Sequence, residues 1–329
     1  MKIYDCFCFS GEINLLNLRL KLYENIVDYF VVVESNVDFR GNKKKVILDS
    51  EFLNKNPKII YVHLSEKDFI VDDAWHREIV SRNAIRRGLK NAKDDDLIII
   101  SDIDEIISPS KLPKTANSIR VYEMYWHRFF PQYINFISTW KHASSFPFKY
   151  LKIYEPFDMK LIRKNFYQKK VIPIDKYEEI PEAGSHLSYF PKEYQSKKNN
   201  KIFNIIYKSI KNKINSFPKD HLKGKYANFK TSEKEFKLLF FFGIDILGVK
   251  NIWGCTSNPF DHFPIEERII INQFLNFLQI KTIFNVNNSR SILRFSNFIS
   301  IFLWRIIFFF ISLYFRFIRY LITLLNLKS

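Results

Sequence analysis

Four short, apolar runs in the first hundred residues limit most strongly what this chain can fold into. They are KIYDCFCF at 2–9, YFVVVES at 29–35, KIIYVHL at 58–64 and LIIIS at 97–101. Segments with a helical spacing of apolar residues lie between them, at 12–25 and 74–91. Runs that are apolar throughout suit strands buried on both faces. The alternation therefore predicts an α/β fold in which helices cover both faces of a parallel sheet.

Beyond residue 118 the pattern changes to shorter, aromatic-rich segments. Strands are predicted for IRVYEMYWHRFF at 119–130, KYLKIYE at 149–155, MKLIRKN at 159–165 and AGSHLSYF at 183–190. We expect these strands to form the second half of a mixed sheet. A helix is predicted at 265–279, and NVNNSRS at 285–291 is typical of a linker.

An acidic stretch, SDIDEI at 101–106, follows the most apolar predicted strand. Asp102 and Asp104 are two residues apart, so their carboxylates can face the same side of an extended or turning backbone. Ligands of open α/β sheets bind beyond the carboxyl ends of the strands, which is where this stretch lies. Paired carboxylates there suit Mg²⁺ or Mn²⁺, which takes further ligands from substrate phosphates. The alternative is an acidic turn that caps the segment from Ile106 to Leu112, and the position at a strand end favours the metal site.

Several stretches of the chain, in order, resemble one known family. They are FCFSGEINLLNLRLKLYENIVDYFVVVESNVDFRG at 7–41, DDAWHREIVSRNAIRRGL at 72–89 and DDLIIISDIDEI at 95–106, with weaker matches at 159–165 and 183–190. Together they resemble glycosyltransferase family 17, which includes the bisecting β-1,4-N-acetylglucosaminyltransferases and many bacterial proteins. The chain looks like a bacterial member, and the resemblance covers roughly residues 1–260.

The resemblance implies a GT-A-like fold, with a Rossmann-type, mostly parallel mixed sheet flanked by helices. It also implies a nucleotide-sugar donor, a divalent metal and inversion at the anomeric carbon. Asp102 and Asp104 would be the metal-site acids, and Glu105 would lie close to the donor sugar. Ser185 stands where we expect the family to carry Trp, which leaves the sugar and acceptor preference open.

Four other side chains are candidates for this site. His186 would be a third metal ligand, as GT-A enzymes often use a late His, or else a hydrogen-bonded structural His. Arg82 would grip the donor diphosphate, because a guanidinium fork suits phosphate, or else form an i,i+4 ion pair with Glu78. Glu12 and Glu34 end the first two strands and would bond the nucleotide, or else cap the loops there.

An inverting transfer needs a carboxylate that takes the proton of the acceptor hydroxyl. Glu105 is the predicted catalytic base, because it already belongs to the predicted crevice. Asp220, Asp245 and Asp261 are the other candidates, and the sequence does not choose among the four.

The net charge of +17 is concentrated in two segments. Residues 191–240 hold 13 Lys and four acidic residues, and residues 290–329 hold five Arg, one Lys and no acidic residue. Such clusters indicate an anionic partner. In the second segment, Arg294, Arg305 and Arg316 are eleven residues apart, close to three helical turns, and so fall on one stripe.

The rest of this C-terminal tail is apolar, which predicts an amphipathic helix that lies on an anionic membrane. The longest stretch without charge between its arginines, residues 306–315, has ten residues. A transmembrane span, the alternative, needs about 20. The interleaving of arginine with bulky apolar residues argues against a nucleic-acid partner.

We therefore predict two regions: a glycosyltransferase domain at 1–284, with the lysine-rich segment 192–237 within it, and a linker with a membrane-associating helix at 285–329. Cys6 and Cys8 are expected to be core thiols, and the N-terminus does not resemble a signal peptide. These features predict a cytoplasmic protein on the inner face of the plasma membrane.

The predicted activity is the transfer of a sugar, such as N-acetylglucosamine, from a nucleotide sugar to a saccharide or lipid-linked saccharide, as in lipopolysaccharide or capsule synthesis. Two alternatives stay open from the sequence. One is another metal-dependent transfer from a nucleotide donor, since the same acids could serve it. The other is a basic protein that binds lipid or nucleic acid without catalysis.

Overall fold

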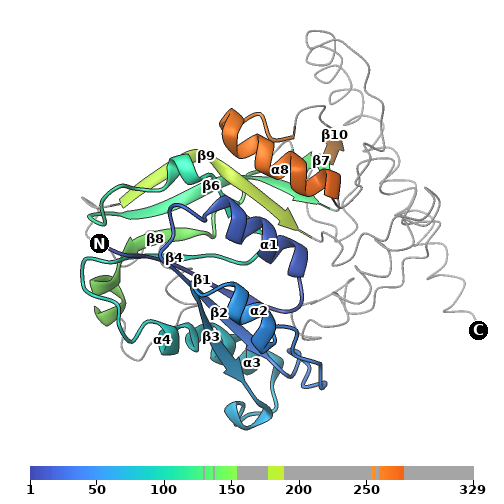
Figure 1. Ribbon diagram of the computed structural model, residues 1–329, viewed down its shortest axis with the longest axis vertical. Coiled ribbons are helices and arrows are strands. Elements are labelled where there is room, and N and C mark those ends of the chain that lie inside the picture. Colours follow the sequence, from blue (N-terminus) through green and yellow to red (C-terminus); the bar gives the residue numbers. More distant parts are fainter. Residues whose placement is uncertain (129, 136–137, 154–176, 189–252, 256–258, 278–329) are drawn as a thin grey trace, which may run out of the picture. The chain divides into compact units, whose positions relative to one another are not determined.

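The computed structural model describes residues 1–128, 130–135, 138–153, 177–188, 253–255 and 259–277 of the 329-residue chain. All of them belong to one compact unit, residues 1–281 (Figure 1). The predicted strand at 159–165, the lysine-rich segment and the C-terminal tail lie outside the described residues. None of the helices in the described ranges combines the length and the apolarity needed to cross a membrane.

The four predicted N-terminal strands form a parallel half-sheet. Its order is β4 (Leu97–Ile100), β1 (Ile3–Phe9), β2 (Tyr29–Ser35) and β3 (Ile59–Leu64), and every neighbouring pair is parallel. The carboxyl ends of these strands therefore meet at one edge of the sheet. This confirms the parallel arrangement predicted from the apolar runs.

The second half of the sheet is mixed, as predicted. From β4 outward it continues with β8 (Ser144–Pro147), β6 (Ile119–Arg128), β7 (Phe130–Asn135) and β10 (Trp253–Cys255). The long strand β9 (Tyr177–Ser188) pairs with β6 in parallel, and β5 (Glu105–Ile107) pairs with β9 in the antiparallel sense. The strand that follows the acidic stretch is thus joined to the mixed half of the sheet.

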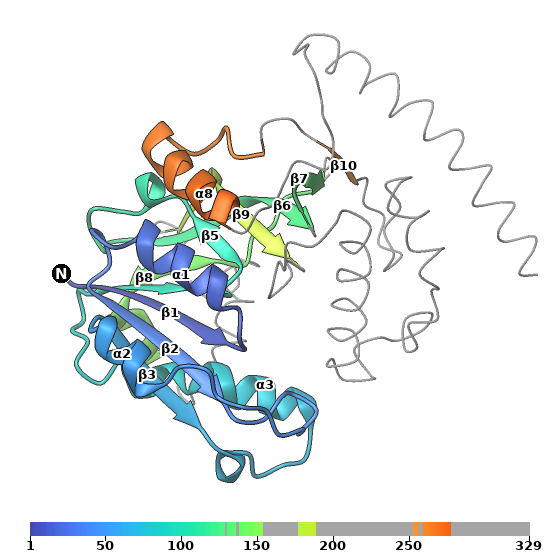
Figure 2. The ribbon, with the colours of Figure 1, turned by 45° about the vertical axis from the view of Figure 1, so that its right-hand side comes forward.

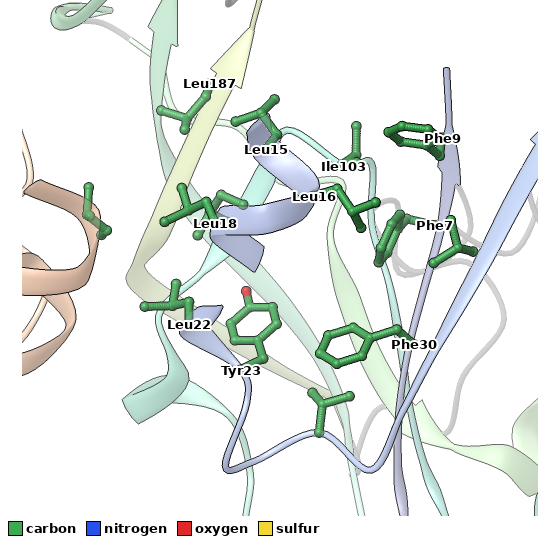
Figure 3. Close-up of a cluster of buried hydrophobic side chains, with 14 of the residues drawn as sticks. Phe7, Phe9, Leu15, Leu16, Leu18, Leu22, Tyr23, Phe30, Ile103 and Leu187 are labelled. Carbon is green, nitrogen blue, oxygen red and sulfur yellow. The ribbon is translucent and has the colours of Figure 1, made fainter. Parts of the chain in front are cut away.

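Helices cover both faces of the sheet (Figure 2). On one face, α1 (Ile13–Leu22), α2 (Ser50–Lys55) and α8 (Ile265–Phe277) pack over a core rich in Phe and Leu. Figure 3 shows the leucines of α1 in one cluster with Ile103 of the acidic stretch and with phenylalanines of β1 and β2. On the other face, α3 (Ala74–Asn83) packs against β1 and β2, and α4 (Ile85–Gly88) packs against β1, β2 and β3, with Ile85 in one core with Val31 and Val33.

Short 3-10 turns complete the described elements: η1 (Glu66–Asp68), η2 (Pro109–Lys111) and η3 (Phe148–Ile153). The last one corrects the sequence prediction, which placed a strand at 149–155. The backbone N–H groups of Phe148 and Lys149 donate to the carbonyls of Asp96 and Asp94, at 2.8 and 3.2 Å. The segment is therefore tied to the loop before β4 rather than to a neighbouring strand.

Neither of the two N-terminal cysteines forms a disulfide, and both lie on the α4 side of β1. Cys6 is buried in that core, and Cys8 is half-buried against it. Both positions agree with the predicted role as core thiols.

Candidate active site

Residues 102–105, which we call the acidic turn, connect β4 to β5 at the carboxyl edge of the parallel half-sheet. The turn is closed by two hydrogen bonds: the Glu105 N–H donates to the Asp102 carbonyl at 3.0 Å, and the Asp102 N–H donates to the Glu105 carboxylate at 2.8 Å. Ile103 is buried in the core beneath α1. The side chains of Asp102 and Asp104 keep 31% and 14% exposure, so both reach the surface of the turn.

Arg82 reaches the acidic turn from α3. Its Nη1 lies 2.7 Å from Asp102 Oδ1, and its Nε lies 3.2 Å from Glu78 Oε1. Burial alone would lower the pKa of Arg82, but the neighbouring Asp102 carboxylate and other nearby groups raise it instead. The predicted i,i+4 ion pair with Glu78 is therefore present. Arg82 also pairs with Asp102, a predicted metal-site acid, so the three side chains form one ion-pair network.

Glu105 is fully buried, and both of its carboxylate oxygens accept hydrogen bonds. One oxygen accepts from the Asp102 N–H, and the other accepts from the indole N–H of Trp140 at 2.6 Å. The Trp140 ring stacks on His186 with 4.2 Å between ring centres. Glu105 thus links the turn to the stacked rings of Trp140 and His186.

The antiparallel pairing of β5 with β9 places His186 beside the acidic turn, with Glu105 and His186 directly opposite each other. His186 Nε2 lies 3.6 Å from Asp104 Oδ1. Its other ring nitrogen, Nδ1, is buried and has no hydrogen-bond partner among the described residues. Sequence spacing could not relate residue 186 to residue 104, and the sheet pairing brings the two together.

The Asp104–His186 pair fits a divalent cation in part. A carboxylate and an imidazole at this separation could contact one ion, and Mn²⁺ accepts both donor types. Within the described part of the chain, however, three or more His, Cys, Asp or Glu side chains do not gather into a ready-made site. Such ions commonly use one or two protein ligands and complete their shell with water and substrate phosphate.

Glu12 and Glu34 lie at the same sheet edge but differ in their surroundings. Glu12 Oε2 accepts the Ser10 N–H at 2.9 Å and is half-buried. Glu34 is fully buried and accepts from the N–H groups of Ile47 and Leu48, at 2.8 and 3.2 Å, so it holds the loop after β2. Contact of either acid with a nucleotide stays a prediction.

One of the other predicted bases can be placed. Asp261 is exposed and forms an ion pair with Arg268 at 2.8 Å. Asp220 and Asp245 lie outside the described residues.

A histidine cluster around Ser185, the neighbour of His186 on β9, was not predicted. Ser185 Oγ lies 2.9 Å from His127 Nε2 and 3.0 Å from His262 Nε2. Burial, followed by the proximity of His127, lowers the pKa of His262 to about 3. The two rings come from β6 and from the segment before α8, so no local sequence pattern relates them to Ser185.

A comparison with protein families matches the N-terminal part of the chain. Residues 1–139 match the model of glycosyltransferase family 17, and this range contains α1, α3 and the whole acidic turn. The match supports a glycosyltransferase.

Three similar proteins are β-1,4-mannosyl-glycoprotein 4-β-N-acetylglucosaminyltransferases. The identity over 116 residues is 30% for the Homo sapiens protein, 28% for Rattus norvegicus and 27% for Mus musculus. Each match covers 32% of this chain and 21 or 22% of the relative. The chain thus spans about a fifth of the length of the curated relatives it matches.

Proposed function

We propose that this protein is a metal-dependent, inverting glycosyltransferase that takes its sugar from a nucleotide-sugar donor. One observation carries the proposal: the segment that matches the glycosyltransferase family model places a pair of partly exposed aspartates just after its central strand. In open α/β sheets, this edge is where ligands bind. The GT-A-like interpretation of the fold is part of the same proposal.

In this proposal Asp102, Asp104 and His186 hold Mn²⁺ or Mg²⁺: Asp104 lies 3.6 Å from His186, and Asp102, which pairs with Arg82, is two residues away on the same turn. The bound ion would neutralise the charge that develops on the departing nucleotide diphosphate. Arg82 would contact the diphosphate with donors that its two ion pairs do not use, since a guanidinium group has five N–H donors. Glu12 would contact the nucleotide from the neighbouring strand end.

Glu105, which we predicted as the catalytic base, has no exposed surface and both oxygens bonded within the protein. This placement favours a role in holding the turn against Trp140. The base for the acceptor hydroxyl would then come from another carboxylate.

The acceptor in this proposal is a saccharide or a lipid-linked saccharide at the inner face of the plasma membrane. The support is in the sequence: the cationic stripe of the tail and the lysine-rich segment 192–237 both suit an anionic membrane surface. A membrane-bound position would bring the enzyme to a lipid-linked acceptor while the donor arrives from solution.

A thermal-shift screen of nucleotide sugars, with and without Mn²⁺, tests the donor site. A ligand that binds only the folded protein stabilises it by about 2.7 kcal/mol at a hundred times its Kd. We expect one nucleotide sugar to raise the melting temperature only when Mn²⁺ is present, and Asp104→Asn to abolish this shift. Asp95→Asn is the matched control, because it removes the same charge from an exposed acid outside the acidic turn.

The products formed from the binding donor, without acceptor, separate the classes of function. Slow release of free sugar together with the nucleoside diphosphate supports glycosyl transfer, whereas release of a sugar 1-phosphate supports nucleotidyl transfer. A shift that is equal in Asp104→Asn and the unmodified protein contradicts the proposed site. A protein that binds no nucleotide sugar under any condition contradicts the proposed function.

A further inference from the structure

The acidic turn rests on an arginine that is completely buried. Arg19 lies on α1, and its guanidinium uses every N–H donor it has. Nε and Nη2 donate to the two carboxylate oxygens of Asp5, each at 2.6 Å, and Nη2 also donates to Ser101 Oγ. Nη1 donates to the carbonyls of Asp102 and Glu105, at 2.9 and 3.2 Å. One side chain thus holds both ends of the acidic turn.

The surroundings of Arg19 keep this group charged and fixed in place. The guanidinium carbon lies 4.5 Å from the ring centre of Phe7 and 5.6 Å from that of Tyr23. Burial opposes the charge of Arg19, and the bidentate Asp5 carboxylate raises its pKa above the ordinary value. Asp5 on β1 is also fully buried, so neither side chain of the ion pair contacts solvent.

The direction of these bonds determines where the acids of the turn point. Because the carbonyls of Asp102 and Glu105 face Arg19, the backbone of the turn is anchored from the α1 side. Ile103 is buried on that same side, among the residues drawn in Figure 3. The carboxylates of Asp102 and Asp104 keep their exposure on the outside of the anchored turn.

Stability alone does not account for this arrangement. A buried ion pair is often no more stabilising than two apolar side chains of similar volume, since desolvation offsets the attraction. Lysine could keep the charge next to Asp5, but its three donors lack the planar fork that reaches two carbonyls at once. The feature that only arginine supplies here is the fixed geometry of residues 101–105.

We propose that Arg19, oriented by Asp5, is a positioning residue that holds Asp102 and Asp104 in the geometry that binds the divalent cation. This inference rests on the proposed function, because it assigns Arg19 to the same metal and donor site. Arg19 acts through the backbone of the turn and does not itself contact the ligand.

The double variant Asp5→Leu/Arg19→Met tests the role of Arg19 without leaving a charge buried and unpaired. We expect it to fold, because apolar side chains fill the space of the ion pair. We also expect its Kd for Mn²⁺, measured from the electron paramagnetic resonance signal of the free ion, to rise about tenfold or more. Outer-shell partners of metal ligands typically have effects of this size.

Two single variants complete the test. Arg19→Lys keeps the charge beside Asp5 but loses the planar guanidinium group that reaches both carbonyls, so its Mn²⁺ affinity should fall as well. If the double variant does not fold, this variant tests the positioning role alone. Val62→Ala is a control that weakens the core on the opposite face of the sheet. Its Mn²⁺ affinity should equal that of the unmodified protein, because a general loss of stability does not displace the turn.

The outcomes distinguish this inference from the proposed function. Unchanged Mn²⁺ affinity in the folded double variant, or in Arg19→Lys, overturns the positioning role while the proposed function stands. An equal loss in Val62→Ala also overturns it, because the effect would then follow stability alone. If the unmodified protein binds neither Mn²⁺ nor a nucleotide sugar, the proposed function and this inference fall together.

Discussion

Two arginines reach the acidic turn from opposite faces of the sheet. Arg19 comes from α1 and binds the backbone carbonyls of the turn, whereas Arg82 comes from α3 and binds the Asp102 carboxylate. The first contact orients the turn, and the second partly neutralises it. The two arginines therefore affect the turn differently, because one contacts its backbone carbonyls and the other contacts a carboxylate side chain.

Arg82→Gln should change the binding of metal and donor in opposite directions. Removing a cation 2.7 Å from Asp102 relieves repulsion of Mn²⁺, so the Kd for Mn²⁺ alone should fall several-fold. The Kd for the nucleotide sugar in saturating Mn²⁺ should rise about tenfold or more, because a hydrogen bond to a charged group is lost. Titration calorimetry measures both constants.

Arg86→Gln is the matched control for Arg82→Gln, since Arg86 is exposed one helical turn further along the chain. It removes the same charge from an exposed side chain and should leave both constants within twofold of their original values. Equal effects in the two variants would show that only the net charge matters.

At the level of the elements, the described part of the chain ends in α8, which joins distant parts of the sequence. α8 packs beside α1, and its Glu267 accepts hydrogen bonds from Ser108 Oγ at 2.6 Å and from the Ser110 N–H at 2.9 Å. These serines belong to the segment that follows β5. The helix is thereby attached to the strand that begins at the acidic turn.

Glu267→Ala should lower the free energy of unfolding by about 1–3 kcal/mol, because it leaves a buried hydroxyl and a backbone N–H without their acceptor. Urea denaturation measures the change. Glu266→Ala is the control: its side chain is exposed at the neighbouring position, and its effect should stay within about 0.5 kcal/mol. A similar result for both variants would contradict the anchoring role of Glu267.

The elements that local pattern predicted well are those whose burial repeats along the chain. β1 to β4, α1 and α8 begin and end within a few residues of the predicted bounds. Their apolar residues recur at the positions that each element buries, so the pattern shows where the element begins and ends. The helix predicted at 74–91 is interrupted after Asn83 and continues as α4. β5, with three residues, is too short to leave a pattern, and its pairing with β9 defines it.

At the scale of the whole molecule, most of the net charge of +17 comes from residues 191–240 and 290–329, and little of it from the described sheet and helices. The proposed membrane contact rests on the second of these segments. Because each basic residue near an anionic surface contributes about 1 kcal/mol, the stripe should give affinity that salt weakens.

Arg305→Glu/Arg316→Glu in the full-length protein should weaken binding to vesicles that contain phosphatidylserine by more than tenfold, as measured by cosedimentation. Vesicles of phosphatidylcholine alone should bind both proteins weakly. The matched control, Lys55→Glu/Lys90→Glu, makes the same change in net charge at exposed positions of the described domain. An equal loss of binding in the control would contradict a specific role of the stripe.

The candidate site itself was only partly visible in the sequence. Asp102 and Asp104 stand out because they follow an apolar strand directly. Asp5 and Arg19 carried a weaker signal that we did not use: each is a single charge within an otherwise apolar strand or helix face, and opposite charges in such positions can pair. Trp140 and the cluster around Ser185 left no signal, since their partners lie far away along the chain.

The sequence by itself determined the parallel half-sheet, the helices that cover it and the position of two aspartates at the end of a strand. These follow from periodicity, which depends only on near neighbours in the chain. Only the tertiary structure decided that His186 lies opposite Glu105, that Arg82 is paired with Asp102, and that Arg19 holds the turn from beneath. Each of these contacts joins residues from different elements, so it depends on how the sheet pairs and which face each helix covers.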